Sequence, residues 1–372
     1  MFNRRDMKKI IISLLAFLPL VAAAQGGQFT GSGYYRVQNK ASQRYVSVVD
    51  NKNTTITATN NDLCALLMLS DFEEEVASNP ATICYFEETP NGYNLKGQDL
   101  NLKNLSGYYL QIESRANGSY RLYGKVSAVV MYLIDYTIAG WRHPNTGGGD
   151  YAFWYLLPVT QADGQYFGVK PDVQASSDGT YWATLYAGFA YKPSDTGMKV
   201  YRVDRTEGAY AIIREITDVV PANTPVLVRC SGATPKDNKL TLVAPQSVNV
   251  GTTLLEGNFY CNDEEGQPQH RNVTAYDPNT MRVLGTTADG HPAFVKSDIK
   301  YLPANKCYLP LSSSAPATLK IVTEEEYAAG IEHVTLSPEE RMNGDYYDLM
   351  GNRVAHPTKG LYIRNGKKVV LR

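Results

Sequence analysis

Two phrases set the expected fold of this chain, VVPANTPVLV at residues 219–228 and YLPANKCYLP at residues 301–310. In each phrase a Pro-Ala-Asn segment stands between apolar residues. Proline fixes the backbone φ angle and asparagine favours turns, so each segment predicts a rigid bend. The first bend leads into the apolar run 226–228 and the second into 307–309. Both phrases therefore predict the same local structure, a β-strand that starts from a tight turn.

Strand-like runs surround these phrases and predict one antiparallel β-sandwich over residues 179–323. The clearest runs are TYWATLY at 180–186, MKVYRV at 198–203 and AIIREI at 211–216. Each is short, rich in β-branched or aromatic residues and bounded by turn-forming residues, which is typical of a sandwich. Side chains alternate between the two faces of a strand, so Tyr181 and Trp182 point in opposite directions and one of them must face the core.

The N-terminal half carries further short strands and one helical pattern. The sequence GYYRVQNKASQRYVSVV at residues 33–49 predicts a hairpin, because two strand-like runs flank a polar turn. Apolar residues then recur at helical spacing from residue 63 to residue 76, behind the polar residues 60–62, and predict one helix of about fifteen residues. More strand-like runs lie between residues 83 and 169. We therefore predict a barrel-like β domain over residues 25–178 with one helix.

The opening hairpin resembles the first strand pair of ricin-type β-trefoil lectins. The similarity lies in the order of an aromatic residue, Asn, Ser and Tyr, met here as Tyr35, Asn39, Ser42 and Tyr45. It implies a trefoil-like domain, although the repeated Gln-x-Trp elements of that family are absent from this sequence. The segment TYWATLYAGFAY and the two Pro-Ala-Asn phrases resemble a β domain of secreted surface proteins of Bacteroidetes. That resemblance implies where the protein is located, at the cell surface or outside the cell, more than what it binds or what reaction it catalyses.

The first 24 residues predict a cleaved signal peptide. Four basic residues precede an apolar run at 10–21, and three alanines ending at Ala24 stand before Gln25. This order is that of a secretory leader, and the run is too short to span a bilayer as a helix. We expect cleavage after Ala24. We expect the mature chain to be secreted or held at the outer cell surface, with no membrane span.

Charge and size narrow the class of protein. The formal net charge is −1, and loss of the leader removes four basic residues and one acid, which leaves −4. Nucleic-acid binding normally needs a basic patch, so this mildly acidic chain predicts no nucleic-acid partner. A chain of 372 residues exceeds what one hydrophobic core normally serves, so we expect more than one domain. Its 27 tyrosines against 10 phenylalanines favour half-exposed strands.

A polar linker at residues 324–343 precedes a small β module, GDYYDLMGNRVAHPTKGLYIRNGKKVVLR, at 344–372. Within it, Asn365-Gly366 is a type I′ hairpin signal. The module resembles the C-terminal sorting domains of the type IX secretion system of Bacteroidetes. The matching residues are Tyr347, Asp348, Leu349, Gly351, Val354, Lys359, Gly360, Tyr362, Ile363, Gly366 and Lys367. The resemblance implies that secretion machinery recognises the tail. The alternative is a β appendage packed on the preceding domain.

No catalytic, cofactor or metal residue is predicted. The histidines are scattered, and no HExxH, GxSxG or phosphate-binding loop spacing occurs. The acidic clusters consist of adjacent residues whose side chains diverge, so they do not form the facing pair of a glycosidase. The five cysteines contain no Cys-x-x-Cys pair, which argues against zinc. They are either buried free thiols or include one disulfide among Cys230, Cys261 and Cys307.

Aromatic residues are the feature with a binding character. Trp141 lies in the loop GWRHPNTGGG beside Arg142 and His143, and it is the candidate among the aromatic residues for exposure and for a ligand contact. Trp154, in the run FWYLLPV, is expected in the core. The sequence favours a non-enzymatic surface or secreted protein that acts in adhesion or glycan binding, with a glycan or a host or surface protein as partner. The alternatives are an extracellular hydrolase whose site converges only in three dimensions, and a structural module of a surface assembly.

Overall fold

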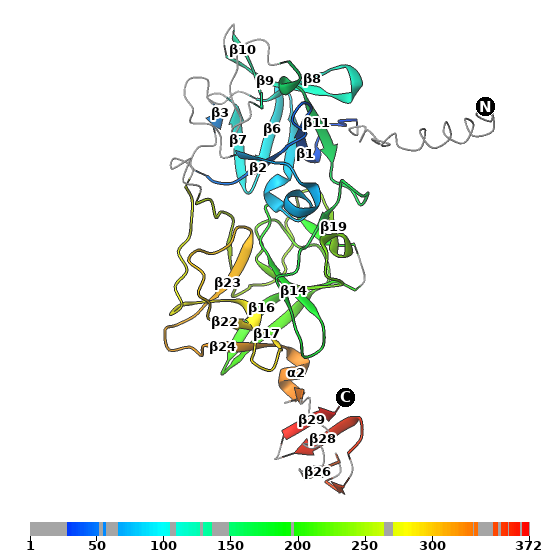
Figure 1. Ribbon diagram of the computed structural model, residues 1–372, viewed down its shortest axis with the longest axis vertical. Helices are drawn as coiled ribbons and strands as arrows, with labels where there is room; N and C mark the ends of the chain where they lie inside the picture. The colour runs from blue at the N-terminus through cyan, green and yellow to red at the C-terminus, as the bar shows by residue number, and fades with distance from the viewer. Residues whose placement is uncertain are drawn as a thin grey trace, which may run out of the picture.

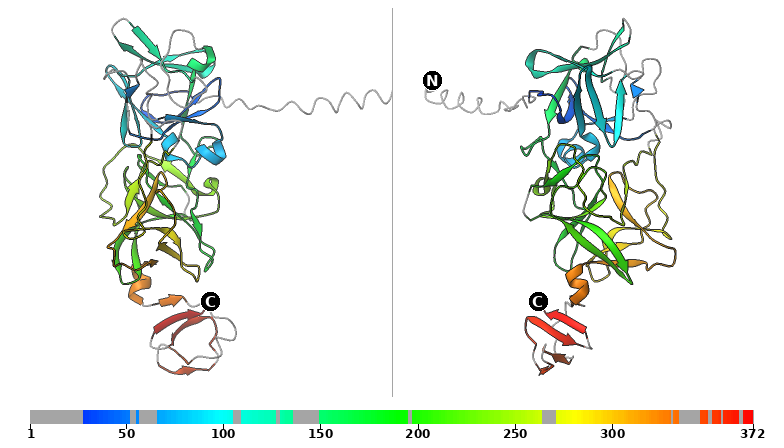
Figure 2. Two further views of the ribbon diagram at one scale, coloured as in Figure 1. Left: turned by 60° about the vertical axis from the view of Figure 1, so that its left-hand side comes forward. Right: turned by 180° about the vertical axis from the view of Figure 1, so that it is seen from behind.

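The computed structural model describes residues 28–51, 55–56, 66–104, 109–126, 129–135, 149–194, 197–263, 271–329, 331–333, 345–348, 351–355, 357–364 and 367–371. Its strands form four sheets of eleven, three, ten and five strands, which confirms a mainly β fold. The eleven-stranded sheet lies at one end of the elongated molecule, the ten-stranded sheet follows, and the small C-terminal sheet is at the other end (Figure 1 and Figure 2).

The first sheet contains the N-terminal strands, and their order is β10-β9-β11-β1-β5-β6-β7-β3, with β2, β4 and β8 attached beside it. Its core is built around Val37, Phe86, Leu122 and Trp154, so Trp154 is buried as predicted. The predicted hairpin is present, because β1 and β2 pair antiparallel through Gln38 and Tyr45. The strands are β1 (Gly33–Asn39), β2 (Tyr45–Val48), β3 (Thr55–Ile56), β4 (Leu66–Leu69), β5 (Cys84–Thr89), β6 (Gly92–Gly97), β7 (Leu100–Asn104), β8 (Gln111–Ser114), β9 (Tyr120–Val126), β10 (Val129–Tyr132) and β11 (Trp154–Pro158).

The predicted helix of about fifteen residues is wrong over its described part. Leu66–Leu69 forms β4 and pairs antiparallel with β2. Only one helical turn remains, η1 (Phe72–Val76), where the Asp71 side chain accepts a hydrogen bond from the Glu74 amide. A short apolar run fits a buried strand as well as a helix, and the edge of β2 supplies the hydrogen-bond partners that decide between them. The start of the predicted helix, residues 60–65, lies outside the described residues.

The ten-stranded sheet curls into a half-barrel and holds most of the C-terminal strands. Its order is β13-β14-β18-β16-β17-β24-β22-β21-β23-β20. Neighbouring strands are antiparallel except β17 and β24, which are parallel. The strands are β13 (Val173–Gln174), β14 (Tyr181–Leu185), β16 (Lys199–Glu207), β17 (Tyr210–Ile216), β18 (Val226–Cys230), β20 (Glu256–Asn258), β21 (Met281–Thr286), β22 (Pro292–Val295), β23 (Lys306–Pro310) and β24 (Thr318–Thr323). The three-stranded sheet beside it consists of β12 (Phe167–Gly168), β15 (Tyr191–Pro193) and β19 (Lys239–Leu242).

Both Pro-Ala-Asn turns are present and have the same geometry. Asn223 and Asn305 adopt left-handed φ angles of 61° and 57°, and each precedes a strand, β18 or β23. Asparagine enters this region more readily than most residues, which explains its place in both phrases. The Asn223 amide donates to the Ala187 carbonyl at 2.9 Å, and the Asn305 carbonyl accepts from the Tyr186 amide at 2.9 Å. The two turns therefore hold the same loop, which leaves β14 after Leu185.

The Asn305 turn, which holds this loop, also meets the first sheet through a buried pair of side-chain amides. The Gln98 side chain donates to the Asn305 side-chain oxygen at 2.9 Å, and the Asn305 side chain donates back at 2.9 Å. The Tyr260 hydroxyl donates to the Gln98 carbonyl at 2.9 Å. Gly188 lies so close that a Cβ there would stand 2.9 Å from the Asp99 nitrogen. The first sheet and the ten-stranded sheet are thus joined through polar groups that are buried and paired.

The connection between the two parts of the chain begins before residue 179. The last strand of the first sheet ends at Pro158, and both β12 and β13 pair with strands that lie later in the chain. Ile83, from the first part, packs in the same hydrophobic cluster as Ala183 and Val226. The division at residue 178 stays a prediction.

The C-terminal module follows a short helix, α2 (Glu324–Ala329), and its five strands are ordered β25-β29-β28-β26-β27. They are β25 (Ile331–His333), β26 (Tyr346–Tyr347), β27 (Arg353–Val354), β28 (Gly360–Arg364) and β29 (Lys367–Leu371). The predicted hairpin is present as the antiparallel pair β28 and β29, and Asn365-Gly366 itself lies outside the described residues. Within the described chain, no helix has the length and apolar character of a membrane span.

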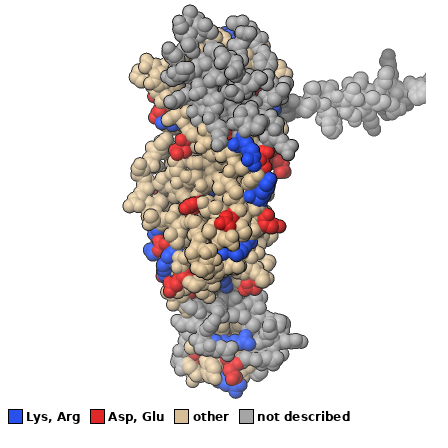
Figure 3. All heavy atoms as spheres, turned by 90° about the vertical axis from the view of Figure 1, so that its left-hand side faces the viewer, with Lys and Arg blue, Asp and Glu red and all other residues tan. Residues whose placement is uncertain are grey.

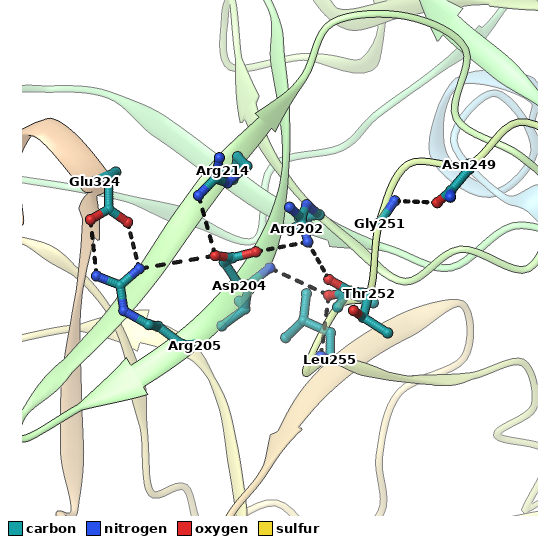
Figure 4. A network of polar contacts seen from close by, with 11 residues as sticks. Arg202, Asp204, Arg205, Arg214, Asn249, Gly251, Thr252, Leu255 and Glu324 are labelled. Atoms are coloured by element: carbon teal, nitrogen blue, oxygen red, sulfur yellow. Dashed lines mark hydrogen bonds and ion pairs between the residues drawn. The ribbon is translucent and has the colours of Figure 1, made fainter.

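A polar network ties α2 to the ten-stranded sheet. Arg205, on β16, donates to both carboxylate oxygens of Glu324, one of them at 2.9 Å. Asp204 lies beside Arg205 and also contacts Arg202 at 2.7 Å and Arg214 at 3.5 Å (Figure 4). Bidentate pairing of this kind fixes orientation as well as distance, so the start of α2 has a defined position on the ten-stranded sheet.

The junction predicts coupled stability losses. Gln98→Ala should lower the free energy of unfolding by about 1–3 kcal/mol, because the buried side-chain oxygen of Asn305 loses its hydrogen-bond donor. Asn305→Ala should cost at least as much. The double variant should cost clearly less than the sum of the two single losses, because the two side chains act as one pair.

Denaturant titration of the four proteins measures these losses. Asn91→Ala, at an exposed asparagine, is the control and should change stability by no more than about 0.5 kcal/mol. Strictly additive losses at positions 98 and 305 would contradict the paired arrangement.

Candidate functional site

The aromatic residue predicted to bind a ligand lies outside the described residues, as does the predicted cleavage position. This holds for Trp141, which lies in the undescribed segment 136–148, and for Ala24. Trp182 is buried in one hydrophobic cluster, and Tyr181, on the other face of β14, is half-buried against a second cluster that contains Ala183, so neither offers an open platform. Among the described residues, no group of three or more His, Cys, Asp or Glu is arranged to hold a metal ion.

A hollow of about 390 Å³ at the junction of the two parts is the candidate binding site. Segments far apart in the sequence line it: the η1 turn with the following η2 (Pro80–Thr82), the end of β12, the end of β14 and the second Pro-Ala-Asn turn. Its apolar floor includes Phe167, Val169 and Leu185. Its polar lining is Glu74, Glu75, Ser78, Asn79, Lys170, Asn305 and Lys306. A concave site with an apolar floor and a few polar groups is the usual form of a ligand site.

The wall formed by η1 and η2 is held from beneath by the fully buried Arg36. The guanidinium donates to the Thr82 hydroxyl at 3.1 Å, the Gln165 carbonyl at 3.2 Å and the Val76 carbonyl at 3.4 Å. It also lies over the Phe72 ring, 5.3 Å from the centroid. Burial lowers the pKa of Arg36 to about 10, so it remains protonated at neutral pH. A cation surrounded by oxygen acceptors fixes the two short turns to β1.

Further contacts fix the ends of this wall. The Asn79 side chain accepts a hydrogen bond from the Ala81 amide at 3.0 Å and so starts η2. The buried Tyr166 donates its hydroxyl to Glu73 at 2.8 Å, and its pKa is raised, first by burial and then by this carboxylate. With Asp71 at the start of η1, these bonds leave Glu74 and Glu75 as the exposed carboxylates of the wall.

The positive charges of the hollow come from two lysines, one in the segment after β12 and one at the start of β23. Lys306 begins β23, and its ammonium contacts Asp172 at 2.6 Å and the Thr184 carbonyl at 3.3 Å. Lys170 is exposed, and among the described residues its ammonium has no hydrogen bond or ion pair. The Asn305 side chain is already committed to Gln98 and to the Tyr186 carbonyl. One lysine is therefore held in place and the other is available.

The acids of the hollow all come from one turn. Its two carboxylates come from consecutive residues of one turn, and among the described residues no other acid, histidine or cysteine lines it. A glycosidase needs two carboxyl groups that face each other across the bond to be cleaved. The hollow does offer hydrogen-bond acceptors, hydrogen-bond donors and charges of both signs. These groups suit a polar ligand with several hydroxyl or charged groups.

A second hollow of about 360 Å³ lies beside β15, β16 and β17. Its lining includes Lys192, Met198, Lys199, Glu215 and Asp218. Lys199 and Glu215 already form an ion pair at 2.8 Å. The junction hollow has more unpaired charge and a larger apolar floor, and it is the stronger candidate.

The motif residues of the C-terminal module mostly build the module itself. The Asp348 side chain accepts from the Asn352 amide at 2.8 Å, and Gly351 between them has a φ of +87° that requires glycine. Tyr362 packs against Tyr346, which is the buried centre of the module but lies outside the matched motif. Tyr347 is 37% exposed. Leu349 and Gly366 lie outside the described residues, and of Lys367 only the backbone is described.

The four described cysteines are free, which confirms the free-thiol prediction for them. Burial raises the pKa of Cys84, Cys230 and Cys307 to about 12. The Cys307 thiol donates to the Leu185 carbonyl at 3.2 Å and so supports the same loop as the Asn305 turn. A thiol with such a pKa is no nucleophile at neutral pH.

These pKa values predict slow labelling of the native protein by a thiol reagent at pH 8. With a pKa of about 12, Cys84 and Cys307 should be thiolate in only about one part in ten thousand. The half-buried Cys261 should react first among the four described cysteines. Mass mapping of labelled peptides with and without denaturant checks this order. Rapid labelling of Cys307 in the folded protein would show that the loop it supports is open.

Comparison with models of known protein families gives no match, and comparison with curated protein sequences gives none either. The site is therefore judged by its own geometry.

Proposed function

We propose that this chain is an exported, non-enzymatic surface or secreted protein that acts in adhesion by binding glycan, and that the junction hollow is its binding site. The polar lining of the hollow carries the proposal. Carboxylates, amides, hydroxyls and ammonium groups are the protein groups that hydrogen-bond sugar hydroxyls. Their supports, Arg36 and the pair formed by Gln98 and Asn305, are buried and satisfied, so the lining is organised before a ligand arrives.

Surface charge is compatible with this function. Positive and negative side chains are interspersed on the described face shown in Figure 3, rather than gathered by sign. A mixed surface does not favour a polyanion such as nucleic acid, which binds to a basic patch. A polar ligand would instead be recognised locally, at the hollow.

An extracellular hydrolase is the less favoured alternative. Hydrolysis at the hollow would need a second acid facing Glu74 and Glu75, and the described lining supplies none. A structural module that pairs its sheet edges with a partner is also less favoured. The edge strands of the ten-stranded sheet, β13 and β20, have two and three residues, and such short edges are poor templates for added strands.

The proposal also covers the two ends of the chain and the fold of each part. The leader that ends at Ala24 would direct export, and the C-terminal module would be the sorting signal that delivers the chain to the outer surface. The first part would be a trefoil-like or barrel domain and the second a β-sandwich. The compact turn at Asp348 and Gly351 supports a folded module at the C-terminus.

Export predicts a defined mass for the protein recovered from the cells that make it. The N-terminus should be Gln25, because signal peptidase cuts after Ala24. If the tail is a sorting signal, the protein in the medium or on the surface should also have lost residues from its C-terminal end or gained an attached group. Intact-mass spectrometry of cell-associated and released protein measures both ends. An intact leader on the native protein would contradict export.

If the hollow binds glycan, substitution of the carboxylates that line it should weaken glycan binding. The double variant E74Q/E75Q should bind any glycan found on an array at least about tenfold more weakly, because charge-assisted hydrogen bonds to sugar hydroxyls are lost. Glu325→Gln, at an exposed glutamate of α2, is the matched control and should bind like the parent. An array on which the full chain binds no glycan would contradict the proposed function.

A further inference from the structure

The carboxylates and the free ammonium of the junction hollow do not neutralise one another. Among the described residues no ion pair joins Glu74 or Glu75 to Lys170 or Lys306, although all four line the same hollow. Glu75 accepts a hydrogen bond from the Ser70 amide at 3.1 Å, and among the described residues the Glu74 carboxylate has no hydrogen bond or ion pair. Lys306 is neutralised by Asp172 at 2.6 Å. Two carboxylates and one ammonium group that form no ion pair with each other among the described residues therefore line one site.

The two signs are carried by different elements. Glu74 and Glu75 are fixed on η1, which Arg36 binds to the first sheet. Lys170 follows Val169, whose amide donates to the Asn238 carbonyl at 2.9 Å. The Gly168 amide donates to the Ala77 carbonyl at 3.1 Å and so joins the segment before Lys170 to the end of η1. The side chains are long enough to move, but the backbones that carry them are set by buried hydrogen bonds.

We propose that the ligand of this hollow is zwitterionic, a sugar that carries both a free amino group and a carboxylate. Its ammonium would lie against Glu74 and Glu75, and its carboxylate would accept from Lys170. This inference rests on the proposed function, because it names the class of glycan bound. A purely acidic sugar would meet the carboxylates of Glu74 and Glu75, and a purely basic sugar would leave Lys170 without an anion. A neutral sugar would leave both charges to water.

Four monosaccharides with closely related rings separate these cases. Muramic acid carries an amino group and a carboxylate, N-acetylmuramic acid only the carboxylate, glucosamine only the amino group, and N-acetylglucosamine neither. Binding of each to the full chain is measured by titration calorimetry or ligand-observed NMR at neutral pH. Muramic acid should bind at least about tenfold more tightly than each of the other three, as one extra charge-assisted contact predicts.

Two variants assign the contacts. Lys170→Met should reduce muramic acid binding to the level of glucosamine, and E74Q/E75Q should reduce it to the level of N-acetylmuramic acid. Lys359→Met, at an exposed lysine of the C-terminal module, and Glu325→Gln are the matched controls and should leave binding unchanged. Circular dichroism of each variant shows whether it is folded, and both changes affect exposed side chains.

The possible results distinguish the proposal of a zwitterionic ligand from the proposal of glycan binding. Equal or tighter binding of N-acetylglucosamine, lost in E74Q/E75Q, would overturn the zwitterionic ligand and leave glycan binding in place. No binding of any sugar, on the array or in titration, would overturn glycan binding. In that case a free dipeptide, which is zwitterionic without a sugar ring, tests the charge arrangement separately. Binding of the dipeptide that requires Lys170 and Glu74 would support the charge arrangement, and its absence would overturn it.

Discussion

The left-handed turn at Asn305 is the constraint on which the arrangement of the molecule depends. Its backbone carbonyl holds the Tyr186 amide, and its side chain reaches Gln98 of the first sheet. Asn223 holds the next residue of the same loop from the other Pro-Ala-Asn turn. Because these groups are buried, loss of any one bond leaves an unsatisfied polar atom, which costs more than the bond itself contributes. The two parts of the chain are thereby fixed against each other.

The hollow follows from that constraint. One wall belongs to η1 and η2, supported by Arg36, and the other contains residues beside the Asn305 turn. A charge such as Arg36 is tolerated in the interior because oxygen acceptors surround it and an aromatic ring covers it. The carboxylates and lysines above these supports remain exposed. Where the ten-stranded sheet meets the C-terminal module, Arg205 and Glu324 hold the start of α2 through charge-assisted bonds (Figure 4).

The parts of the fold that depend on local pattern could be predicted from the sequence. The hairpin of β1 and β2, the buried Trp154, the two Pro-Ala-Asn turns and the hairpin of β28 and β29 each have a signal within about ten residues. The segment before Asn79 could not be predicted in this way, because a strand and a helix compete for it and the edge of β2 decides. The burial of Arg36 gave no signal either, since a strand pattern does not reveal what covers each face. The hollow was missed because its lining comes from separate segments, and Glu74 and Lys170 gain meaning only when the chain brings them together.

Hydrogen–deuterium exchange of the full chain, with and without a saturating sugar, tests most directly whether the junction is where ligand is bound. The account predicts slower exchange with ligand at residues 70–80, 167–171 and 304–307, the segments that form and support the hollow. Exchange in the second hollow, at residues 192–218, and in the C-terminal module should be unchanged. Protection confined to those regions, with none at the junction, would contradict the account.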